Sequence, residues 1–366
     1  MNVAPRERRI AALRNAIAAA QLDGLLVSSL PNIRYLSGFS GSSALLLVTS
    51  DDALLLTDFR YSIQANAEVA GAARVLIEPT SLWARLWAEL PAMGAAGSIG
   101  FESAHLTHAD SQRLVDPPQG GARTQWRASV NMVESLRERK DAGEIANIRE
   151  AARIAEAALE QTIVRVRAGM TELGICGILE GALRACGSEA HPFETIIASG
   201  ERAALPHARS SGREILAGEL LLIDFGAEYG GYCSDITRTF VMGKASAEQR
   251  EIHDVVREAC ATASGAIRAG MRGKDADALA RGYIQRRGWG EAFGHSLGHG
   301  IGLEVHEAPR LSKLADAPLP AGAVVTIEPG IYRPGWGGVR IEDDVLLTAE
   351  GPDVITRFPR ELIELG

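Results

Sequence analysis

The stretch ELLLIDFGAEYGGYCSDITRTF, residues 219–240, predicts a buried β-hairpin that carries two acidic side chains. Asp224 follows the apolar run LLLI, and Asp235 lies eleven residues later, beyond the turn sequence GAEYGG. A single acid in such a place is most often a surface residue at the end of a strand. A solvated acid, however, does not require a fully apolar strand in front of it.

The stretch AVVTIEPGIYRPGWGGVRIEDDVLL, residues 323–347, has the same pattern. Glu328 follows the apolar run VVTI, and Glu342 lies fourteen residues later, beyond a turn rich in glycine and proline. Four acids in matching positions on two hairpins are poorly explained as surface residues. The sequence therefore predicts that four carboxylates converge in a partly buried cleft.

A repeat precedes the two hairpins. The tetrapeptide RAGM occurs at 167–170 and again at 268–271, and each copy precedes a helical stretch that ends at a glycine, Gly187 or Gly288. The tetrapeptide and the glycine recur at the same offset of 101 residues. This common offset predicts two structurally related halves that face each other across the cleft.

Carboxylates in such a cleft repel one another, so several must be protonated or must bind cations. Two divalent metal ions would neutralise four of them. The segment GHSLGHGIGLEVHEAP, residues 294–309, adds three of the eight histidines of the chain. An oxygen-rich set with one imidazole suits Mn, Fe, Co or Zn better than a thiolate site does.

The amino-terminal part of the chain predicts a separate, small α/β domain. Short leucine-rich and β-branched runs alternate with turn residues over 24–60, and helical stretches follow. Near residue 130 the pattern changes to a long charged helical tract with an alanine-rich face. A chain of 366 residues favours two domains, which we place at 1–132 and 133–366.

Composition excludes several classes of protein. The net charge of −8 argues against nucleic-acid binding, and the longest apolar runs are too short to cross a membrane. Arg14 interrupts the first apolar-leaning segment, which predicts an amphipathic helix and not a signal peptide. The four cysteines show no CxxC spacing and predict reduced core residues of a cytoplasmic protein.

In order and local sequence, five residues resemble the metal ligands of the pita-bread metallopeptidases, in the aminopeptidase P and prolidase branch: Asp224, Asp235, His299, Glu328 and Glu342. The motifs are DFGAEYGGYCSDITRTF, HSLGHGIGLEVHE, TIEPGIY and GVRIEDD, and residues 24–66 resemble the N-terminal domain of the same branch. The resemblance implies an α/β creatinase-like N-terminal domain and an α+β pita-bread catalytic domain with a pseudo-two-fold repeat.

The resemblance also implies roles for the five ligands. Asp224 and Asp235 would chelate one metal ion, and His299 would bind the other. Glu328 and Glu342 would complete the pair, with Asp235 and Glu342 bridging. Two adjacent ions lower the pKa of a shared water and polarise the scissile carbonyl. Glu328 is the candidate acceptor for the proton of that water.

Other residues match family positions around the metals. His207, His295 and His306 are implied to hold substrate, to stabilise the oxyanion or to shuttle protons. Tyr332 and Arg340 match positions near the leaving group. Arg60, in the segment TDFRY with Asp58 and Tyr61, matches an N-terminal segment that borders the cleft.

The residues by themselves also permit plainer roles. His207 can be an ordinary loop residue, and Asp58 can be a cap of a short turn. Arg340 can form a simple ion pair with Asp343 or Asp344. Packing in the core would then account for Tyr332.

The implied reaction is hydrolysis of the bond between an N-terminal residue and a following proline, with two divalent ions, Mn first and Co, Zn or Fe as alternatives. The segment TDFRY, and the lack of a basic cluster beyond Arg340, favour an Xaa-Pro aminopeptidase. An Xaa-Pro dipeptidase (prolidase) is the alternative. The expected partners are peptides with proline at the second position and a second copy of the chain, in a homodimer.

Three further alternatives are less favoured. A creatinase lacks the metal carboxylates that this chain has, and a methionine aminopeptidase lacks the creatinase-like N-terminal domain. A non-catalytic peptide-binding protein on the same scaffold would be expected to have lost a ligand or one of the histidines around it.

Overall fold

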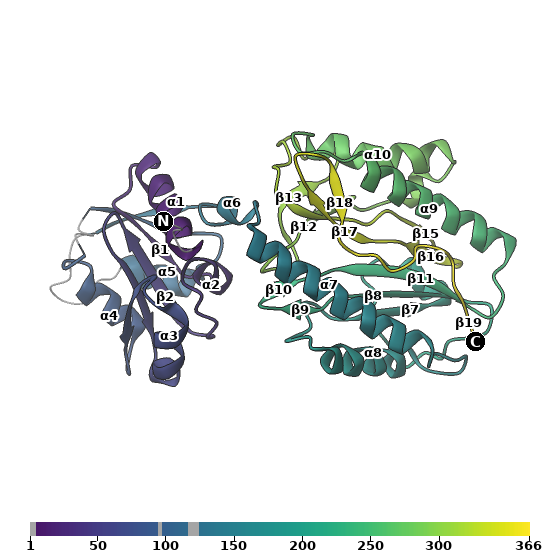
Figure 1. Cartoon of the computed structure of the whole chain (residues 1–366), viewed down its shortest axis with the longest axis horizontal. Helices are drawn as coiled ribbons and strands as arrows, with labels where there is room; N and C mark the ends of the chain where they lie inside the picture. Colours follow the sequence, from purple (N-terminus) through teal and green to yellow (C-terminus); the bar gives the residue numbers. More distant parts are fainter. Residues whose placement is uncertain (1–4, 94–96, 116–123) are drawn as a thin grey trace. The chain divides into compact units, whose positions relative to one another are not determined.

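The structure, a computed structural model, describes residues 5–93, 97–115 and 124–366. The chain forms two compact units, Met1–Arg137 and Glu138–Gly366, which we describe separately (Figure 1). The sequence-based boundary between 132 and 133 falls just before helix α6 (Glu134–Arg137), which belongs to the first unit.

The first unit is a six-stranded mixed sheet with helices, as an α/β domain requires. The strand order is β4-β3-β2-β1-β5-β6, with parallel pairs at β3–β4, β1–β5 and β5–β6. Strands β1 to β3 are buried along their whole length, because helices cover the sheet and favour continuous apolar runs. The strands are β1 Gly24–Val27, β2 Ala44–Thr49, β3 Ala53–Thr57, β4 Arg74–Ile77, β5 Ser98–Glu102 and β6 Gln125–Ser129, and the helices are α1 Pro5–Ala19, α2 Leu30–Ser37, η1 Phe59–Tyr61, α3 Ser62–Val69, α4 Leu82–Glu89 and α5 His108–Val115.

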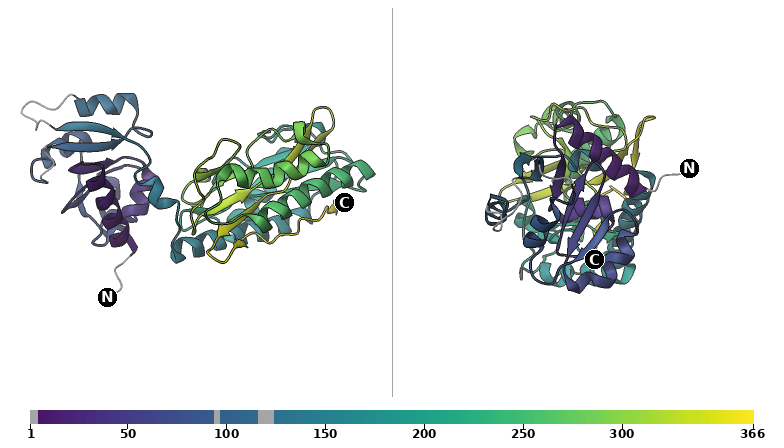
Figure 2. Two further views of the ribbon diagram at one scale, coloured as in Figure 1. Left: turned by 90° about the horizontal axis from the view of Figure 1, so that it is seen from above. Right: turned by 90° about the vertical axis from the view of Figure 1, so that its left-hand side faces the viewer.

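The second unit is built around two larger sheets, each covered by its own pair of helices, and β9–β10 and β15–β16 form two further two-stranded sheets (Figures 1 and 2). Helices α7 and α8 pack on the sheet of order β19-β11-β8-β7, and α9 and α10 pack on the sheet of order β13-β12-β14-β17-β18. The elements of the first half are α7 Ala142–Ile163, α8 Glu172–Cys186, β7 Ile196–Ser199, η2 Gly200–Ala204, β8 Leu220–Phe225, β9 Glu228–Tyr229, β10 Tyr232–Cys233 and β11 Ile236–Met242. Those of the second half are α9 Ala247–Ala266, α10 Gly273–Arg286, η3 Gly290–Ala292, β12 Gly298–Gly300, β13 Glu307–Leu311, β14 Val324–Ile327, β15 Gly330–Arg333, β16 Gly337–Arg340, β17 Asp343–Leu347, β18 Pro352–Val354 and β19 Glu364–Leu365.

The two halves repeat each other in backbone geometry, as the RAGM repeat predicts. Gly169 and Gly270, the glycines of the two copies, both adopt left-handed conformations, with φ of 87° and 83°. The residue two positions after each glycine forms an isolated bridge, Thr171 to Glu214 and Arg272 to Pro318. The pseudo-two-fold repeat of the catalytic domain is thereby confirmed.

The two predicted hairpins are also present. Strand β8 pairs antiparallel with β11, and β14 pairs antiparallel with β17. Asp224 lies in β8, whereas the other three acids lie next to a strand: Asp235 precedes β11, Glu328 follows β14 and Glu342 precedes β17. The two hairpins therefore present their acids at corresponding strand ends.

The remaining sequence-based expectations concern cysteines and membrane spans. All four cysteines are free thiols, with Cys186 partly exposed and the other three buried. Within the described ranges, every helix is either too short or too polar for a bilayer span.

Candidate active site

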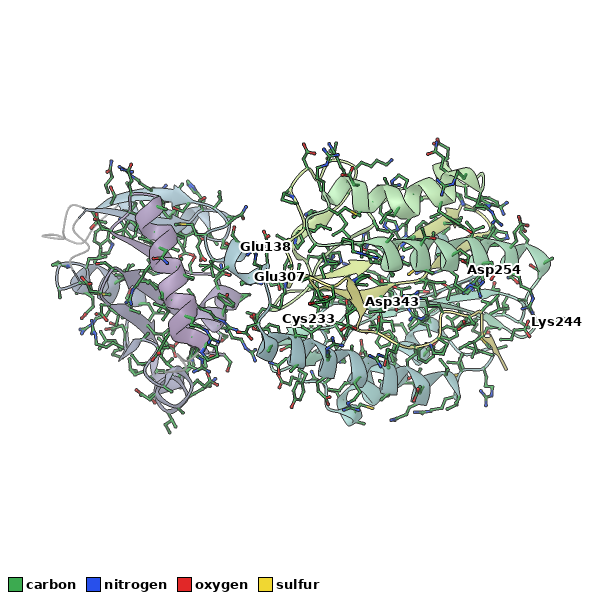
Figure 3. All side chains as sticks on the ribbon, turned by 45° about the horizontal axis from the view of Figure 1, so that its top comes forward. Glu138, Cys233, Lys244, Asp254, Glu307 and Asp343 are labelled. Carbon is green, nitrogen blue, oxygen red and sulfur yellow. The ribbon has the colours of Figure 1, made fainter. Side chains whose placement is uncertain are left out.

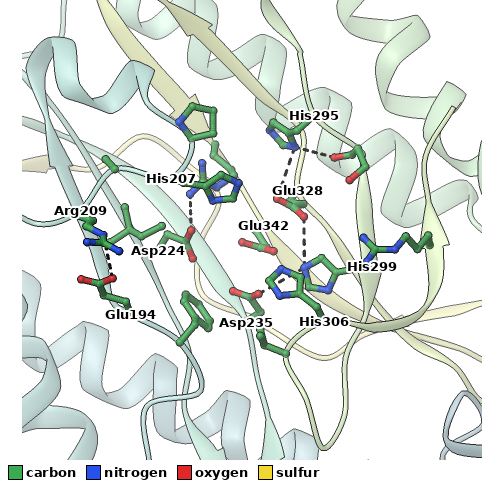
Figure 4. A pocket seen from close by; sticks show the side chains of 18 residues that line it. Glu194, His207, Arg209, Asp224, Asp235, His295, His299, His306, Glu328 and Glu342 are labelled. Atoms are coloured by element: carbon green, nitrogen blue, oxygen red, sulfur yellow. Dashed lines mark hydrogen bonds and ion pairs between the residues drawn. The ribbon is translucent and has the colours of Figure 1, made fainter. Parts of the chain in front are cut away.

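A cavity of about 560 Å³ opens between the two hairpins of the second unit (Figure 4). Nine of the residues selected from the sequence line it: His207, Asp224, Asp235, His295, His299, His306, Glu328, Arg340 and Glu342. Tyr332 lies behind this wall, in contact with His295 and Arg340. The cavity thus collects residues from segments more than a hundred positions apart.

The centre of the cavity has the donor set of a metal site. One ligand atom each from Asp235, His299 and Glu342 lie within 4.8 Å of one another. The Nε2 atom of His299 is 3.6 Å from Oε1 of Glu328 and 4.0 Å from Oδ2 of Asp235. Asp224 lines the same cavity but stands outside this closest group.

The unsatisfied oxygens of the site fit a divalent cation. Oδ1 of Asp224 and Oδ1 of Asp235 are buried without a hydrogen-bond partner in the described part of the chain. A buried carboxylate oxygen without a donor is costly unless a cation or a proton compensates it. The two oxygens therefore have the chemistry expected of metal ligands.

The electrostatics of the carboxylates agree with this. Burial and the charge of Glu342 raise the pKa of Asp235 and that of Glu328 well above their usual values. Burial and the charge of Asp224 raise the pKa of Glu342 to about 8. The carboxylates thus compete for protons where no other cation is present, and bound divalent ions would relieve the repulsion.

His299 is neutral and oriented for coordination. Burial, followed by the nearby His306, lowers the pKa of His299 to about 4. Its Nδ1 lies 3.0 Å from the carbonyl oxygen of Gly300, which can only accept, so Nδ1 carries the proton. The lone pair of Nε2 then faces the carboxylates, as a metal-binding histidine requires.

A hydrogen-bonded chain joins Asp224 to His295. Arg340 Nη2 donates to Asp224 at 2.5 Å, and Arg340 Nη1 donates to the hydroxyl of Tyr332 at 2.8 Å. Nδ1 of His295 donates to the carbonyl of Ser296, so its Nε2 accepts from the Tyr332 hydroxyl at 2.9 Å. Burial raises the pKa of Tyr332 to about 12, and burial followed by the charge of Arg340 lowers that of His295 to about 4. The tyrosine therefore stays a donor and the histidine stays neutral.

The plainer role of Arg340 is wrong, because its carboxylate partner is Asp224 and neither Asp343 nor Asp344. Asp343, labelled in Figure 3, is fully buried and pairs with Arg238 at 2.8 Å and with Arg360 at 2.5 Å. Asp343, the first residue of β17, thus points to the opposite side of the chain from Glu342, which lines the cavity.

A hydroxyl that the sequence did not single out orients a predicted ligand. Thr237 Oγ1 donates to Oε2 of Glu342 at 2.6 Å and accepts from Nε of Arg340 at 3.2 Å. Thr237 faces Asp224 across the β8–β11 ladder, which explains its place beside the site. Its position two residues after Asp235 was the available signal, since alternate residues of a strand share a face.

The remaining histidines surround the metal ligands. The rings of His299 and His306 are 4.3 Å apart between centroids and tilted by 54°. His207 lines the cavity from the loop after η2 (Figure 4). The loop therefore brings His207 to the site, although its role stays a prediction.

Two arginines of the cavity wall were missed in the sequence. Arg209 forms a 3.5 Å ion pair with Glu194, and both side chains are largely exposed. Arg310, on β13, is exposed and has no ion-pair partner among the described residues. Its place four residues after His306 was the only signal. Arg340 is therefore joined by two further basic residues on the cavity wall, which the expected lack of a basic cluster beyond Arg340 did not include.

Arg60 belongs to the first unit. Its guanidinium pairs with Asp58 at 2.7 Å, and the Asp58 carboxylate also accepts from the backbone amide of Arg60. Asp58 is the N-cap of helix η1, so the plainer role of this acid is confirmed. The predicted contact of Arg60 with substrate stays a prediction.

Comparisons with known proteins place this site in a family. Residues 9–139 match the Creatinase/Prolidase N-terminal domain, and residues 146–349 match Metallopeptidase family M24. The uncharacterised peptidase YqhT of Bacillus subtilis is 41% identical over 96% of this chain and 99% of its own length. The Xaa-Pro dipeptidase of Pyrococcus horikoshii is 37% identical over 93% of this chain and 95% of its own length.

Solved structures give the same result. An Xaa-Pro dipeptidase from Bacillus anthracis matches with a TM-score of 0.94 and 40% identity over 98% of this chain and 100% of that chain. An X-Pro aminopeptidase from Thermotoga maritima matches with a TM-score of 0.88 and 38% identity over 97% and 99%. The chain therefore belongs to metallopeptidase family M24 and carries a Creatinase/Prolidase N-terminal domain, as do relatives named Xaa-Pro dipeptidase and X-Pro aminopeptidase.

Proposed function

We propose that the chain is an Xaa-Pro dipeptidase that uses two divalent metal ions, Mn being the first candidate. The observation that carries this choice over an aminopeptidase is Arg310, a guanidinium without an ion-pair partner in the described structure, on the wall of the cavity. The choice replaces our sequence-based preference, which rested on the segment TDFRY and on the lack of a basic cluster beyond Arg340. The relatives named as dipeptidases support it.

The argument from Arg310 is one of charge complementarity. A dipeptide substrate places a free carboxylate directly after the proline ring, and arginine pairs with a carboxylate through two parallel hydrogen bonds. The ring of His306 lies 4.3 Å from that of His299, and the charge of Arg310 contributes, after burial, to the lowered pKa of His306. Arg310 therefore lines the same cavity as the proposed ligands, as the recognition of a substrate only two residues long requires.

An aminopeptidase has the opposite requirement. Its cavity must leave room for a chain that continues beyond the proline, and it gains nothing from a free cation at that point. Because Arg310 is exposed to solvent, its pairing with a carboxylate is worth at most about 1 kcal/mol, which is roughly fivefold in kcat/KM. The expected preference is thus marked but not absolute.

The metal ions would be held by Asp224, Asp235, His299, Glu328 and Glu342. When bound, they supply a water of lowered pKa and polarise the scissile carbonyl. The unpaired buried oxygens of Asp224 and Asp235 and the free Nε2 of His299 are the observations that support this ligand set.

The ligands and the side chains around them perform the proton and binding steps. Glu328 accepts the proton of the attacking water at its carboxylate. His306 and His207 donate to the carbonyl oxygen as negative charge develops on it. The free α-amino group of the substrate lies beside Asp224, an acceptor-only group.

The chain from Arg340 through Tyr332 to His295 fixes the opposite wall. His295 keeps the tautomer in which Nδ1 is protonated, and its ring is held by the Tyr332 hydroxyl. An Xaa-Pro bond has no N–H, so the enzyme cannot grip the scissile amide through that donor. Rigid walls on both sides of the bond therefore have to provide the orientation.

The test is a substrate-length series with Ala-Pro, Ala-Pro-Ala and a longer analogue under one metal. We expect kcat/KM for Ala-Pro to exceed that for Ala-Pro-Ala about fivefold. Arg310→Ala should remove most of that preference, mainly through KM for the dipeptide, and Arg310→Lys should retain part of it.

Arg209→Ala is the matched control, because Arg209 also lines the cavity but is already paired with Glu194. It should leave the ratio between the two substrates within about twofold. Equal or better hydrolysis of Ala-Pro-Ala by the unmodified protein would move the assignment to the aminopeptidase.

A further inference from the structure

Two carboxylates outside the cavity form hydrogen bonds to the two segments that carry His207 and His295. His207 is carried by the loop of residues 200–211, and His295 by the segment of residues 293–297 (Figure 4). Each of the two segments is bonded to one acid on the second helix of its own half, Glu172 on α8 and Asp277 on α10.

Glu172 joins the two ends of the His207 loop. Its Oε1 accepts from the backbone amide of Ser199 at 2.9 Å and from the hydroxyl of Ser199 at 3.0 Å. Its Oε2 accepts from the amide of Ser211 at 3.0 Å and from the hydroxyl of Ser211 at 2.6 Å. One carboxylate therefore closes the base of the loop, with each oxygen bonded to one end.

An arginine inside the loop completes the arrangement. Arg202 Nε donates to Oε2 of Glu172 at 3.1 Å, and Arg202 Nη2 donates to the carbonyl of Arg209. Arg209 is two residues beyond His207, so the guanidinium spans the loop from the carboxylate to the segment that lines the cavity. Glu172 itself is 0% exposed, whereas a loop of this length is normally mobile unless its backbone is bonded.

Asp277 has the same relation to the segment of His295. Its Oδ1 accepts from the amide of Leu297 at 3.1 Å, and both of its oxygens accept from Arg281. Arg281 in turn donates to the carbonyls of Phe293 at 2.8 Å and of His295 at 2.7 Å. The acid and the arginine thus hold the backbone on both sides of the histidine.

We infer that Glu172 and Asp277 are positioning residues, which act on the proposed reaction through the segments that carry His207 and His295. The inference rests on the proposed function for its kinetic part. Neither acid lines the cavity, and among the described residues neither is bonded directly to a proposed metal ligand. Asp277 reaches Glu328 at one remove, because the carbonyl of Leu297 accepts from the Glu328 amide at 2.8 Å. Each instead determines where an imidazole stands relative to the scissile bond, and a displacement of about 1 Å there is enough to lower turnover strongly.

The first test is Glu172→Gln in the metal-loaded protein. The amide retains the shape but replaces one acceptor oxygen by a donor that faces the donors of Ser199 or Ser211. We expect kcat for Ala-Pro to fall about tenfold, with KM and bound metal nearly unchanged. Hydrogen exchange measured by mass spectrometry should show faster exchange in peptides covering residues 199–211.

Glu156→Gln is the matched control. Glu156 lies on α7 and, like Glu172, accepts from two backbone amides, but these belong to Arg357 and Phe358 of the C-terminal segment. This variant should leave kcat and the exchange of residues 199–211 unchanged. If it lowered kcat as much as Glu172→Gln, general destabilisation would explain the effect and the inference would be overturned.

A double-mutant cycle separates positioning from an independent role. In a His207→Ala background, Glu172→Gln should lower kcat less than twofold, because the group through which it acts is gone. Additive losses would refute the inference. In the second half, Asp277→Asn should show the same non-additivity with His295→Ala and faster exchange of residues 293–297, and additive losses there would refute the role of Asp277.

Failure of the proposed function gives a different result. If the unmodified protein failed to hydrolyse Xaa-Pro dipeptides, the kinetic arm would fall with the proposed function. The exchange of residues 199–211 would still decide the inference, because unchanged exchange in Glu172→Gln would overturn it whatever the substrate.

Discussion

Removal of the charge of Asp343 should destabilise the second unit by several kilocalories per mole. The Asp343 carboxylate is 0% exposed and accepts from Arg238, Arg360 and Thr356. Arg238 is 3% exposed, and its other donors go to backbone carbonyls, including that of Glu342. Asp343→Asn leaves this guanidinium buried beside a neutral amide, at a cost of about 3–5 kcal/mol.

The magnitude can be compared with a pair of the same chemistry at the surface. Arg149 and Asp353 also form an ion pair, but their side chains are 36% and 41% exposed. Solvent screens such a pair, so Asp353→Asn should cost at most about 1 kcal/mol. In a unit of this size, Asp343→Asn should lower Tm by roughly 6–20 °C, and Asp353→Asn should lower it by less than about 4 °C.

The assay is urea denaturation and thermal unfolding of both variants in excess chelator, so that metal linkage does not contribute. In the metal-loaded protein, Asp343→Asn should in addition weaken metal binding, because Arg238 bonds to the backbone of Glu342. A loss below 1 kcal/mol for Asp343→Asn, equal to that for Asp353→Asn, would refute the assignment of Asp343 and Arg238 as a charge pair that depends on burial.

Three other predictions follow from the site and the fold. Chelation should abolish hydrolysis, and Mn or Co should restore it. His299→Ala should lower the amount of bound metal, whereas His207→Ala, His295→Ala and His306→Ala should retain metal and lose turnover. Loss of metal in His306→Ala would contradict the proposed roles. The metal-free protein should lose stability as pH rises from about 5 to 8, because the pKa of Glu342 is about 8 in the folded state and near 4.5 when unfolded, so the folded state binds the extra proton in this window. The slope is at most about 1.4 kcal/mol per pH unit for one proton. Stability that increased with pH in a chelator-treated urea series would contradict this prediction. The protein should be a homodimer at micromolar concentration, and a fully active monomer in analytical ultracentrifugation would exclude this prediction.

Much of the fold was predictable because its signals are local. An apolar run followed by an acid, a glycine-rich turn and a second apolar run gives a hairpin with an acid at its end, whatever surrounds it. The two copies of RAGM lie at positions where the backbone must adopt a positive φ, and a glycine meets that requirement in any context. The two-half architecture could therefore be inferred from short segments.

The candidate ligands were predictable for the same reason. Asp224, Asp235, Glu328 and Glu342 occupy matching places on the two hairpins, and His299 lies in a short motif. The partners of these residues were less accessible. Arg340 pairs with Asp224, 116 positions away in sequence, and not with the acids three and four residues after it. The side on which a strand residue emerges decided this, because neighbouring residues of a strand face opposite ways.

The sequence by itself determined the elements, the repeat and the identity of the acids and histidines, since each depends on interactions within one hairpin or one turn. The tertiary structure alone decided which cations and hydroxyls meet them. Arg310 enters the cavity only because β13 pairs with β12. Thr237 reaches Glu342 only because two hairpins from different halves approach each other, and Glu172 closes the loop of His207 only because α8 packs behind it. Contacts of this kind depend on the distance between elements in space, which no local pattern of residues encodes.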